Sequence, residues 1–215
     1  MLEHFQKFDD GDKSLLPLSF SHLNEFAFYR ERWALRRIFG YEFPTSASAI
    51  RGQVVESGIN MFLNGLSLEE AKEKMLSEYD ENCSRINDPK IEDERNNLVP
   101  LFELGTKKFQ DYAYRWRLID YQRKVEVQID DIPFIGYTDF YFEDNHTRED
   151  FFIDLKTSKN LPQKISISHA MQQAIYQKAT NAKQILWYLK TPTKSKSAEY
   201  IAMSLEEYCE HYIIG

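Results

Sequence analysis

Hydrophobic and polar residues follow two different periods along the chain, and the change falls after residue 118. Before it, apolar residues recur every three to four positions, which is the period of a helix with one buried face. Leu23 and Phe26, for example, follow a serine that can cap a helix, Ser19 or Ser21. Ser67 and Glu70 form the capping-box pattern of another helix. The pattern predicts four helices, over residues 19–39, 46–64, 67–85 and 91–118.

After residue 118 the period becomes two, which is typical of a strand with one buried face. Val125, Val127 and Ile129 alternate with polar residues, and the segment 131–133 predicts a hairpin turn. The pattern predicts strands over residues 125–129, 134–142, 151–157, 185–190 and 199–203, and helices over 166–180 and 205–213. The order is four helices, then β-β-β-α-β, then a short β-α tail. It predicts an α/β or α+β fold with a central sheet flanked by helices and with a helical insertion.

The composition favours one globular domain. The chain has 215 residues, of which 42% are hydrophobic and 14% aromatic, which is enough for a core and excludes a disordered chain. Since no repeat or linker interrupts it, we expect a single domain over residues 1–215. Its helical part and insertion span 19–118, and its sheet core spans 46–64 and 123–203. No apolar run reaches the roughly 20 residues of a membrane span, and no signal peptide is evident, so a cytoplasmic protein is expected.

Charge is distributed unevenly along the chain. The formal net charge is -7, which argues against a polyanionic partner. Residues 151–198, however, contain eight lysines and one acid, Asp154, whereas residues 69–95 contain ten acids and five bases. The basic third therefore remains a candidate surface for a polyanion, and a solvated face is the alternative. Nucleotide-binding loops and the zinc-protease and serine-hydrolase motifs are absent from the sequence.

Candidate chemistry lies in the second and third predicted strands. In the segment 153–157, alternation places Asp154 and Lys156 on one face of a strand. Asp139 lies among apolar residues of the preceding strand, and antiparallel pairing would bring it to Asp154. Two adjacent carboxylates repel each other unless a cation lies between them, and oxygen ligands suit Mg²⁺ or Mn²⁺. An exposed ion pair and a turn-capping aspartate are the alternatives.

These residues resemble the PD-(D/E)XK nuclease superfamily, with Asp139 at the end of Gly-Tyr-Thr-Asp and with Asp154-Leu155-Lys156 as the second motif. More narrowly, the chain is similar to the RecB-like branch, to which CRISPR-associated and phage recombination exonucleases belong. Three further motifs support the resemblance: the segment 18–21 with its following helix, the G-x-x-x-H/E motif ending at Glu56, and the Q-x-x-x-Y motif of Gln172 and Tyr176. The motifs keep the order of the family between residues 18 and 190.

The resemblance implies a restriction-endonuclease-like core, a catalytic set and a metal site. The catalytic set is Asp139, Asp154, Lys156, Glu56, Gln172 and Tyr176. Glu56, Asp139, Asp154 and the Leu155 carbonyl would bind one or two Mg²⁺ or Mn²⁺ ions, and the lysine would position a water molecule for attack on a phosphodiester. Glu126 and His169 are secondary candidates, for which an exposed strand residue and a structural histidine are the alternatives.

DNA with free ends is the implied partner. Its backbone would contact residues Arg30, Arg36, Arg37, Arg51, Lys159, Lys164 and Lys178. Tyr41, Phe43, Trp187 or Tyr188 could stack on an unpaired end. The DNA is expected to meet the 151–198 side, with the 69–95 helix facing away.

The sequence also departs from its relatives. Many of them hold an iron–sulfur cluster on four cysteines, whereas this chain has only Cys83 and Cys209 and carries Tyr29-Arg30 in place of the first Cys-Pro, so no cluster is expected. No helicase motif is present. These features favour a stand-alone exonuclease of recombination, repair or phage DNA processing, in a bacterial or phage-infected cell. A single-strand annealing protein, a helicase or further copies of the chain remain as candidate partners. A catalytically inactive DNA-binding or assembly module and a structure-specific or restriction-type endonuclease are the alternatives.

Overall fold

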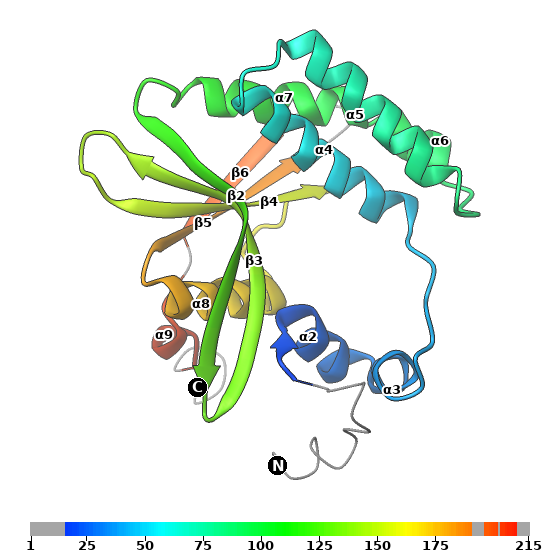
Figure 1. The fold of residues 1–215 in the computed structure, drawn as a ribbon, viewed down its shortest axis with the longest axis vertical. Helices are drawn as coiled ribbons and strands as arrows, with labels where there is room; N and C mark the ends of the chain where they lie inside the picture. The colour runs from blue at the N-terminus through cyan, green and yellow to red at the C-terminus, as the bar shows by residue number, and fades with distance from the viewer. Residues whose placement is uncertain (1–15, 191–195, 202, 210–215) are drawn as a thin grey trace.

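A six-stranded mixed sheet forms the centre of the molecule in the computed structural model, which describes residues 16–190, 196–201 and 203–209 (Figure 1). The strands are β1 (Leu18–Ser19), β2 (Trp116–Ile129), β3 (Ile132–Asp144), β4 (Asp150–Ser158), β5 (Lys183–Lys190) and β6 (Lys196–Ile201). The sheet order is β1-β3-β4-β5-β6, with β2 off this path. Strand β3 pairs with β2 along one edge, and along its other edge with β1 at residues 134–135 and with β4 at residues 140–143. Strand β4 is parallel to β5, and β1 is parallel to β3, whereas the other pairs are antiparallel. This mixed α/β architecture agrees with the predicted fold class.

Helices cover both faces of the sheet (Figure 1). They are α2 (Phe20–Phe28), α3 (Arg30–Arg37), α4 (Ala47–Leu63), α5 (Leu68–Cys83), α6 (Ile91–Arg95), α7 (Leu98–Gln110), α8 (Ile167–Thr180) and α9 (Leu205–Cys209). The largest hydrophobic core lies between the sheet and α4, α5 and α7, and includes Phe140, Ile153, Leu155 and Trp187. A second cluster joins α8 and α2 to the opposite face through Phe20, Val125, Ile175 and Tyr176. None of the helices within the described ranges is both long and apolar enough to span a membrane.

Local signals predicted several elements well. Helix α4 matches the predicted helix 46–64, and α5 begins at the capping box, in which the Ser67 hydroxyl accepts the Glu70 N–H at 3.2 Å. Helix α8 begins after Ser166, whose hydroxyl accepts the His169 N–H at 3.2 Å. These serines satisfy backbone groups that a helix start leaves unpaired, which is why their positions mark the boundaries.

The predicted helix 91–118 is wrong. The structure has the short α6, then α7, and β2 already begins at Trp116. Pro100 explains the first break, because proline has no N–H and fits only the first turn of a helix, so α7 starts just before it. Trp116 stacks on Tyr112, with ring centroids 3.9 Å apart, and pairs across the ladder with Asp144. Its apolar surface therefore joins the sheet core rather than a helix face.

Other boundaries also differ from the prediction. The helix predicted over 19–39 divides at Tyr29 (φ -144°, ψ 61°) into α2 and α3. The hairpin turn lies at Asp130-Asp131, where both φ angles are positive, so Pro133 belongs to β3. Aspartate tolerates this left-handed backbone better than most residues, which suits a two-residue hairpin turn. Helix α9 (Leu205–Cys209) agrees with the start of the predicted helix 205–213, and the remainder of that helix lies outside the described residues.

Candidate active site

The central feature of the site is a fork between β3 and β4. These strands pair from Glu143 opposite Asp150 to Phe140 opposite Ile153, after which β4 continues only beside β5. Asp139 and Asp154 are the first residues beyond the last pair. The Asp139 Oδ2 atom accepts the N–H of Leu155 at 2.8 Å. The structure thus brings the two carboxylates together where the strands separate.

Asp154 and Lys156 share the face of β4 opposite the main core. The Lys156 Nζ atom lies 2.6 Å from Asp154 Oδ2, while Ile153 and Leu155 point into the core cluster. Asp154 is only 2% exposed, and its Oδ1 atom has no hydrogen-bond partner among the described residues. A buried carboxylate oxygen with no donor is costly, so the site favours a cation or a donor from a ligand at this position.

The carboxylates influence one another electrostatically. Burial raises the pKa of Asp139 well above its usual range, and the neighbouring charges of Asp154 and Glu56 raise it further. Burial also raises the pKa of Glu56, with a contribution from Asp154. For Lys156, burial lowers the pKa, but the charges of Asp154 and Asp139 outweigh it and raise the pKa above its ordinary value. Asp139, Asp154 and Glu56 are therefore close enough to influence one another's pKa, and the protonated Lys156 lies beside Asp154, an arrangement that attracts further positive charge.

Glu56 reaches the fork from α4 and is held by two residues that the sequence analysis did not single out. The Gln122 Nε2 atom donates to Glu56 Oε1, and the Tyr121 hydroxyl also hydrogen bonds to this carboxylate. Both residues belong to the first half of β2, which the sequence pattern left outside any predicted strand. No motif marked them, and only the correct register of β2 would have placed them beside Glu56.

Gln172 and Tyr176 lie on one face of α8, as their spacing predicts. The Gln172 Nε2 atom donates to the Tyr176 hydroxyl over 3.4 Å, and that hydroxyl also hydrogen bonds to the Tyr137 backbone N–H. Burial raises the pKa of Tyr176, and the charge of Asp154 adds to this. The tyrosine ring therefore crosses from α8 to β3 close to the fork.

Replacing Gly136 with alanine is expected to displace Tyr176. An alanine Cβ at position 136 would lie 2.4 Å from Tyr176 Cε1 and 2.7 Å from its hydroxyl oxygen, well inside contact distance. We expect the ring to move and the rate of the reaction catalysed at this site to fall by roughly tenfold, because small displacements of positioned groups are costly in an active site. The measurement is the initial rate beside a thermal unfolding curve. Tyr176→Phe is the comparison: if both variants lose the same activity, the effect comes from the Tyr176 hydroxyl. Unchanged activity of Gly136→Ala would contradict the expected displacement of the ring.

The donor set suits a divalent cation. Among the described residues, no group of three His, Cys, Asp or Glu side chains already surrounds a single point. Mg²⁺, however, usually takes one or two protein carboxylates and completes its shell with water and phosphate oxygens. Asp139 and Asp154, with the unpartnered Oδ1 of Asp154, meet this requirement.

The two secondary candidates lie in different places. His169 on α8 contacts the Tyr188 hydroxyl through Nδ1, and its pKa is lowered by burial and then by the charge of Lys156. It is therefore close to the fork. Glu126 is exposed on β2 opposite Ile135 and forms an ion pair with Lys124, N to O 2.6 Å. It is not among the groups at the fork.

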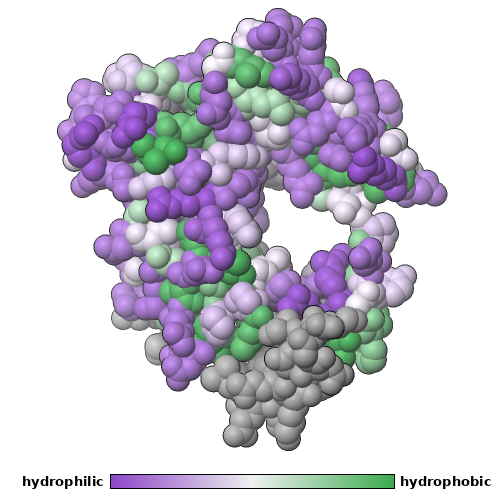
Figure 2. Space-filling model, in the orientation of Figure 1, coloured by the Kyte–Doolittle hydropathy of each residue, from purple (hydrophilic) through white to green (hydrophobic). Residues whose placement is uncertain are grey.

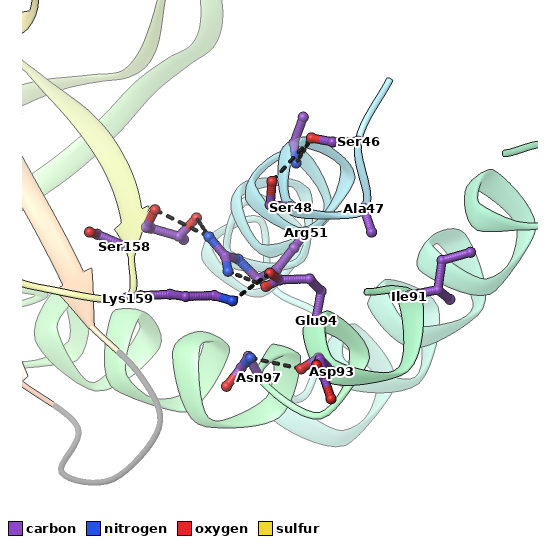
Figure 3. Close-up of polar contacts among 12 residues, drawn as sticks. Ser46, Ala47, Ser48, Arg51, Ile91, Asp93, Glu94, Asn97, Ser158 and Lys159 are labelled. Atoms are coloured by element: carbon purple, nitrogen blue, oxygen red, sulfur yellow. Dashed lines mark hydrogen bonds and ion pairs between the residues drawn. The ribbon is translucent and has the colours of Figure 1, made fainter. Parts of the chain in front are cut away.

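Arg51, expected on the DNA surface, is instead buried, with its side chain between Glu94 and the end of β4 (Figure 3). Its guanidinium pairs with the Glu94 carboxylate and donates to the Thr157 hydroxyl at 3.1 Å and to the Thr157 carbonyl at 3.3 Å. The exposed Lys159 adds a third charge, 3.3 Å from Glu94 Oε1. This cluster joins α4, α6 and the end of β4, directly after Lys156. One acid of the 69–95 segment thus faces inward, toward the end of β4.

The remaining basic candidates lie on exposed or half-buried surfaces. Arg30 and Arg36 are exposed on α3, Arg37 is half-buried there, and Lys164 and Lys178 are exposed before and on α8. A surface hollow beside α3 is lined by Arg32, Arg36, Tyr41 and Phe43. The two arginines lie 4.7 and 5.4 Å from the Phe43 ring centroid. Trp187 and Tyr188 are buried, so neither is available to stack on a nucleotide.

The space-filling view shows an opening beside the sheet (Figure 2). It separates the part that contains α4 and α6 from the part that contains α2 and α3, and the chain between α3 and α4 follows its outer edge (Figure 1). Strand β4, which carries Asp154 and Lys156, points toward it (Figure 1).

Comparisons with known proteins agree with this geometry. The profile of the PD-(D/E)XK nuclease superfamily matches residues 17–211. A protein from Eubacterium rectale, described as "Putative exonuclease", has a similar structure, with a TM-score of 0.55 and 14% sequence identity over 100% of this chain and 81% of that one. A second structure, described as SSO0001, has 15% identity over 85% of this chain and 82% of that one, but its TM-score of 0.36 supports no argument. No curated protein sequence matches the chain significantly. Because the profile covers most of the chain, including the β3–β4 fork, this protein belongs to the PD-(D/E)XK nuclease superfamily.

Proposed function

We propose that this protein is a metal-dependent DNA exonuclease, with Asp139, Asp154 and Lys156 at the centre of its active site. Membership of the superfamily makes it a nuclease that acts on DNA and uses divalent metal ions, commonly Mg²⁺. The observation that carries the proposal is the fork, where two buried carboxylates and a protonated lysine meet beside a third carboxylate.

Each residue at the fork has a proposed role. Asp139, Asp154, Glu56 and the Leu155 carbonyl would hold Mg²⁺ or Mn²⁺. The chemistry that a bound ion supplies at such a site is activation of water and neutralisation of charge on the phosphate. Lys156 keeps its proton, since Asp154 and Asp139 favour the charged form, and its ammonium would orient the attacking water and stabilise the phosphate. Gln172 and Tyr176 would hold the Lys156 side of the site in place.

The surface around the opening supports a substrate with a free end. Arg30 and Arg36 would contact the DNA backbone, and the exposed Tyr41 offers a ring on which an unpaired base can stack, whereas the Phe43 ring already lies against Arg32 and Arg36. Lys164 and Lys178 extend the basic surface along α8. The similarity to the Eubacterium rectale structure adds support for exonuclease action. A role in recombination, repair or phage DNA processing would follow from this activity.

The test compares linear and closed circular DNA. Purified protein is incubated with each substrate in Mg²⁺, Mn²⁺ or EDTA, and the products are resolved on gels. We expect linear DNA to be degraded from its ends, circular DNA to persist, and EDTA to stop the reaction. Nicking or linearisation of circles would identify an endonuclease. Binding of DNA without metal-dependent loss of either substrate would identify a non-catalytic DNA-binding module.

A further inference from the structure

Tyr121 and Gln122 are adjacent in β2, yet both contact the same carboxylate. Gln122 Nε2 donates to Glu56 Oε1, and the Tyr121 hydroxyl hydrogen bonds to the same side chain. In an extended strand, neighbouring side chains point to opposite faces. Two consecutive residues can therefore reach one acceptor only if the backbone departs from the extended form between them.

The backbone of β2 departs from the extended form at this point. Gln122 has a φ of 51°, which is sterically unfavourable for any residue but glycine and unusual within a strand. Just before it, the ladder register shifts between Leu118 and Asp120, so that Ile119 is an extra residue. Bulges of this kind redirect side chains next to functional sites. The two irregularities together turn Tyr121 and Gln122 toward α4.

The Gln122–Glu56 contact also joins parts of the site that come from different elements. Glu56 comes from a helix, whereas Asp139 and Asp154 come from the sheet, and three carboxylates repel one another. In the β2–β3 register, Gln122 falls between the pairs Tyr121–Phe140 and Arg123–Thr138, which places it opposite Asp139. A donor at this position holds Glu56 near the fork despite the repulsion.

We propose that Tyr121 and Gln122 are positioning residues that orient Glu56 as a metal ligand, and that the unfavourable backbone at Gln122 is retained for this purpose. The inference rests on the proposed function, since it assigns Glu56 to the metal site. The same hydrogen bond could serve only to stabilise the packing of β2 against α4. The test must therefore measure metal binding separately from stability.

The experiment compares Gln122→Ala with Gln122→Gly. Neither variant has the amide, but only glycine relieves the positive φ. Metal affinity is measured by calorimetric titration of DNA-free protein with Mg²⁺ and Mn²⁺, and stability by thermal unfolding in EDTA. We expect both variants to bind metal roughly tenfold more weakly, as is typical when a partner of a metal ligand is lost. The glycine variant should unfold at a higher temperature than the alanine variant. Tyr121→Phe, which keeps the ring, should weaken binding less.

Asp131→Gly is the matched control. Asp131 has a φ of 66° in the exposed β2–β3 turn, so glycine relieves a similar backbone conformation far from Glu56. It should increase stability and leave metal affinity unchanged.

Three outcomes would overturn the inference. The contact is structural only if metal affinity follows stability across the unchanged protein, Gln122→Ala and Gln122→Gly. The same holds if metal affinity is equal in all three. If the unchanged protein binds neither metal, the proposed function fails together with the inference.

Discussion

Replacing Lys156 with alanine is expected to lower the rate of DNA cleavage by about a hundred- to a thousandfold, the usual loss when one group that stabilises developing charge is removed. The Lys156 ammonium is the positively charged group of the fork, 2.6 Å from Asp154 Oδ2. Because Asp154 and Asp139 raise its pKa, it stays protonated throughout the neutral pH range and can donate to a water molecule or a phosphate oxygen. The measurement is the initial rate of linear DNA degradation at saturating Mg²⁺.

The control for this experiment is Lys74→Ala, which removes an exposed lysine of α5 on the far side of α4 and should leave the rate unchanged. Lys156→Ala also leaves two buried carboxylates unpaired, so its folding is checked by circular dichroism with Mg²⁺ present. Lys156→Met keeps the length of the stem and gives a second, independent variant. A folded variant with the full rate would contradict the role assigned to Lys156 and would weaken the nuclease mechanism as a whole.

Replacing Glu94 with alanine is expected to destabilise the protein by about 3–5 kcal/mol, the usual loss when one partner of a buried ion pair is removed. Glu94 is 1% exposed and Arg51 is 5% exposed, so the variant would leave a buried guanidinium without its counter-ion. Urea unfolding measures the loss. Asp80→Ala is the matched control, since it breaks the exposed Arg95–Asp80 pair, N to O 2.6 Å, and should cost less than about 1 kcal/mol.

A double variant separates the charge from the packing. Arg51→Met with Glu94→Leu replaces the pair with apolar side chains and is expected to recover most of the free energy of unfolding. It also removes the hydrogen bonds to Thr157, which follows Lys156 in β4, so activity need not recover with stability. A Glu94→Ala variant that unfolds at the same urea concentration as the unchanged protein would show that the pair contributes little.

The fork could be predicted from the sequence because the residues that form it lie in two neighbouring strands joined by a short connection. Strand alternation places Asp154 and Lys156 on one face, and a short connection between two strands makes antiparallel pairing the simplest arrangement. The structure has this pairing, with Phe140 opposite Ile153. The helix starts at Ser67 and Ser166 were predictable for a similar reason, since a capping hydroxyl contacts only the next turn.

The rest of the site depends on contacts between distant residues. Arg51 resembles an exposed cation in the sequence because its partner, Glu94, lies 43 positions later in a run of acids. Gln122 carries no charge and belongs to no motif, so nothing signals its contact with Glu56. The first half of β2 was missed because residues 116–118 were assigned to the end of the predicted helix and residues 119–124 to no element. Packing of Trp116, Leu118 and Tyr121 against the sheet core, which the local pattern does not show, makes this segment a strand.

The fork also determines how this sheet avoids unwanted association. On the edge of β3 shared by β1 and β4, the ladder leaves residues 136–139 without a strand partner in the described part of the chain. Unpaired backbone of this kind is a template for another chain. Here side chains of the site take the place of a strand on both sides of the fork, since Tyr176 binds the Tyr137 N–H of β3 and Asp139 accepts the Leu155 N–H of β4. The same two groups therefore satisfy sheet backbone at the fork as well as shaping the site, so replacing either of them would also leave backbone groups open to pairing with another chain.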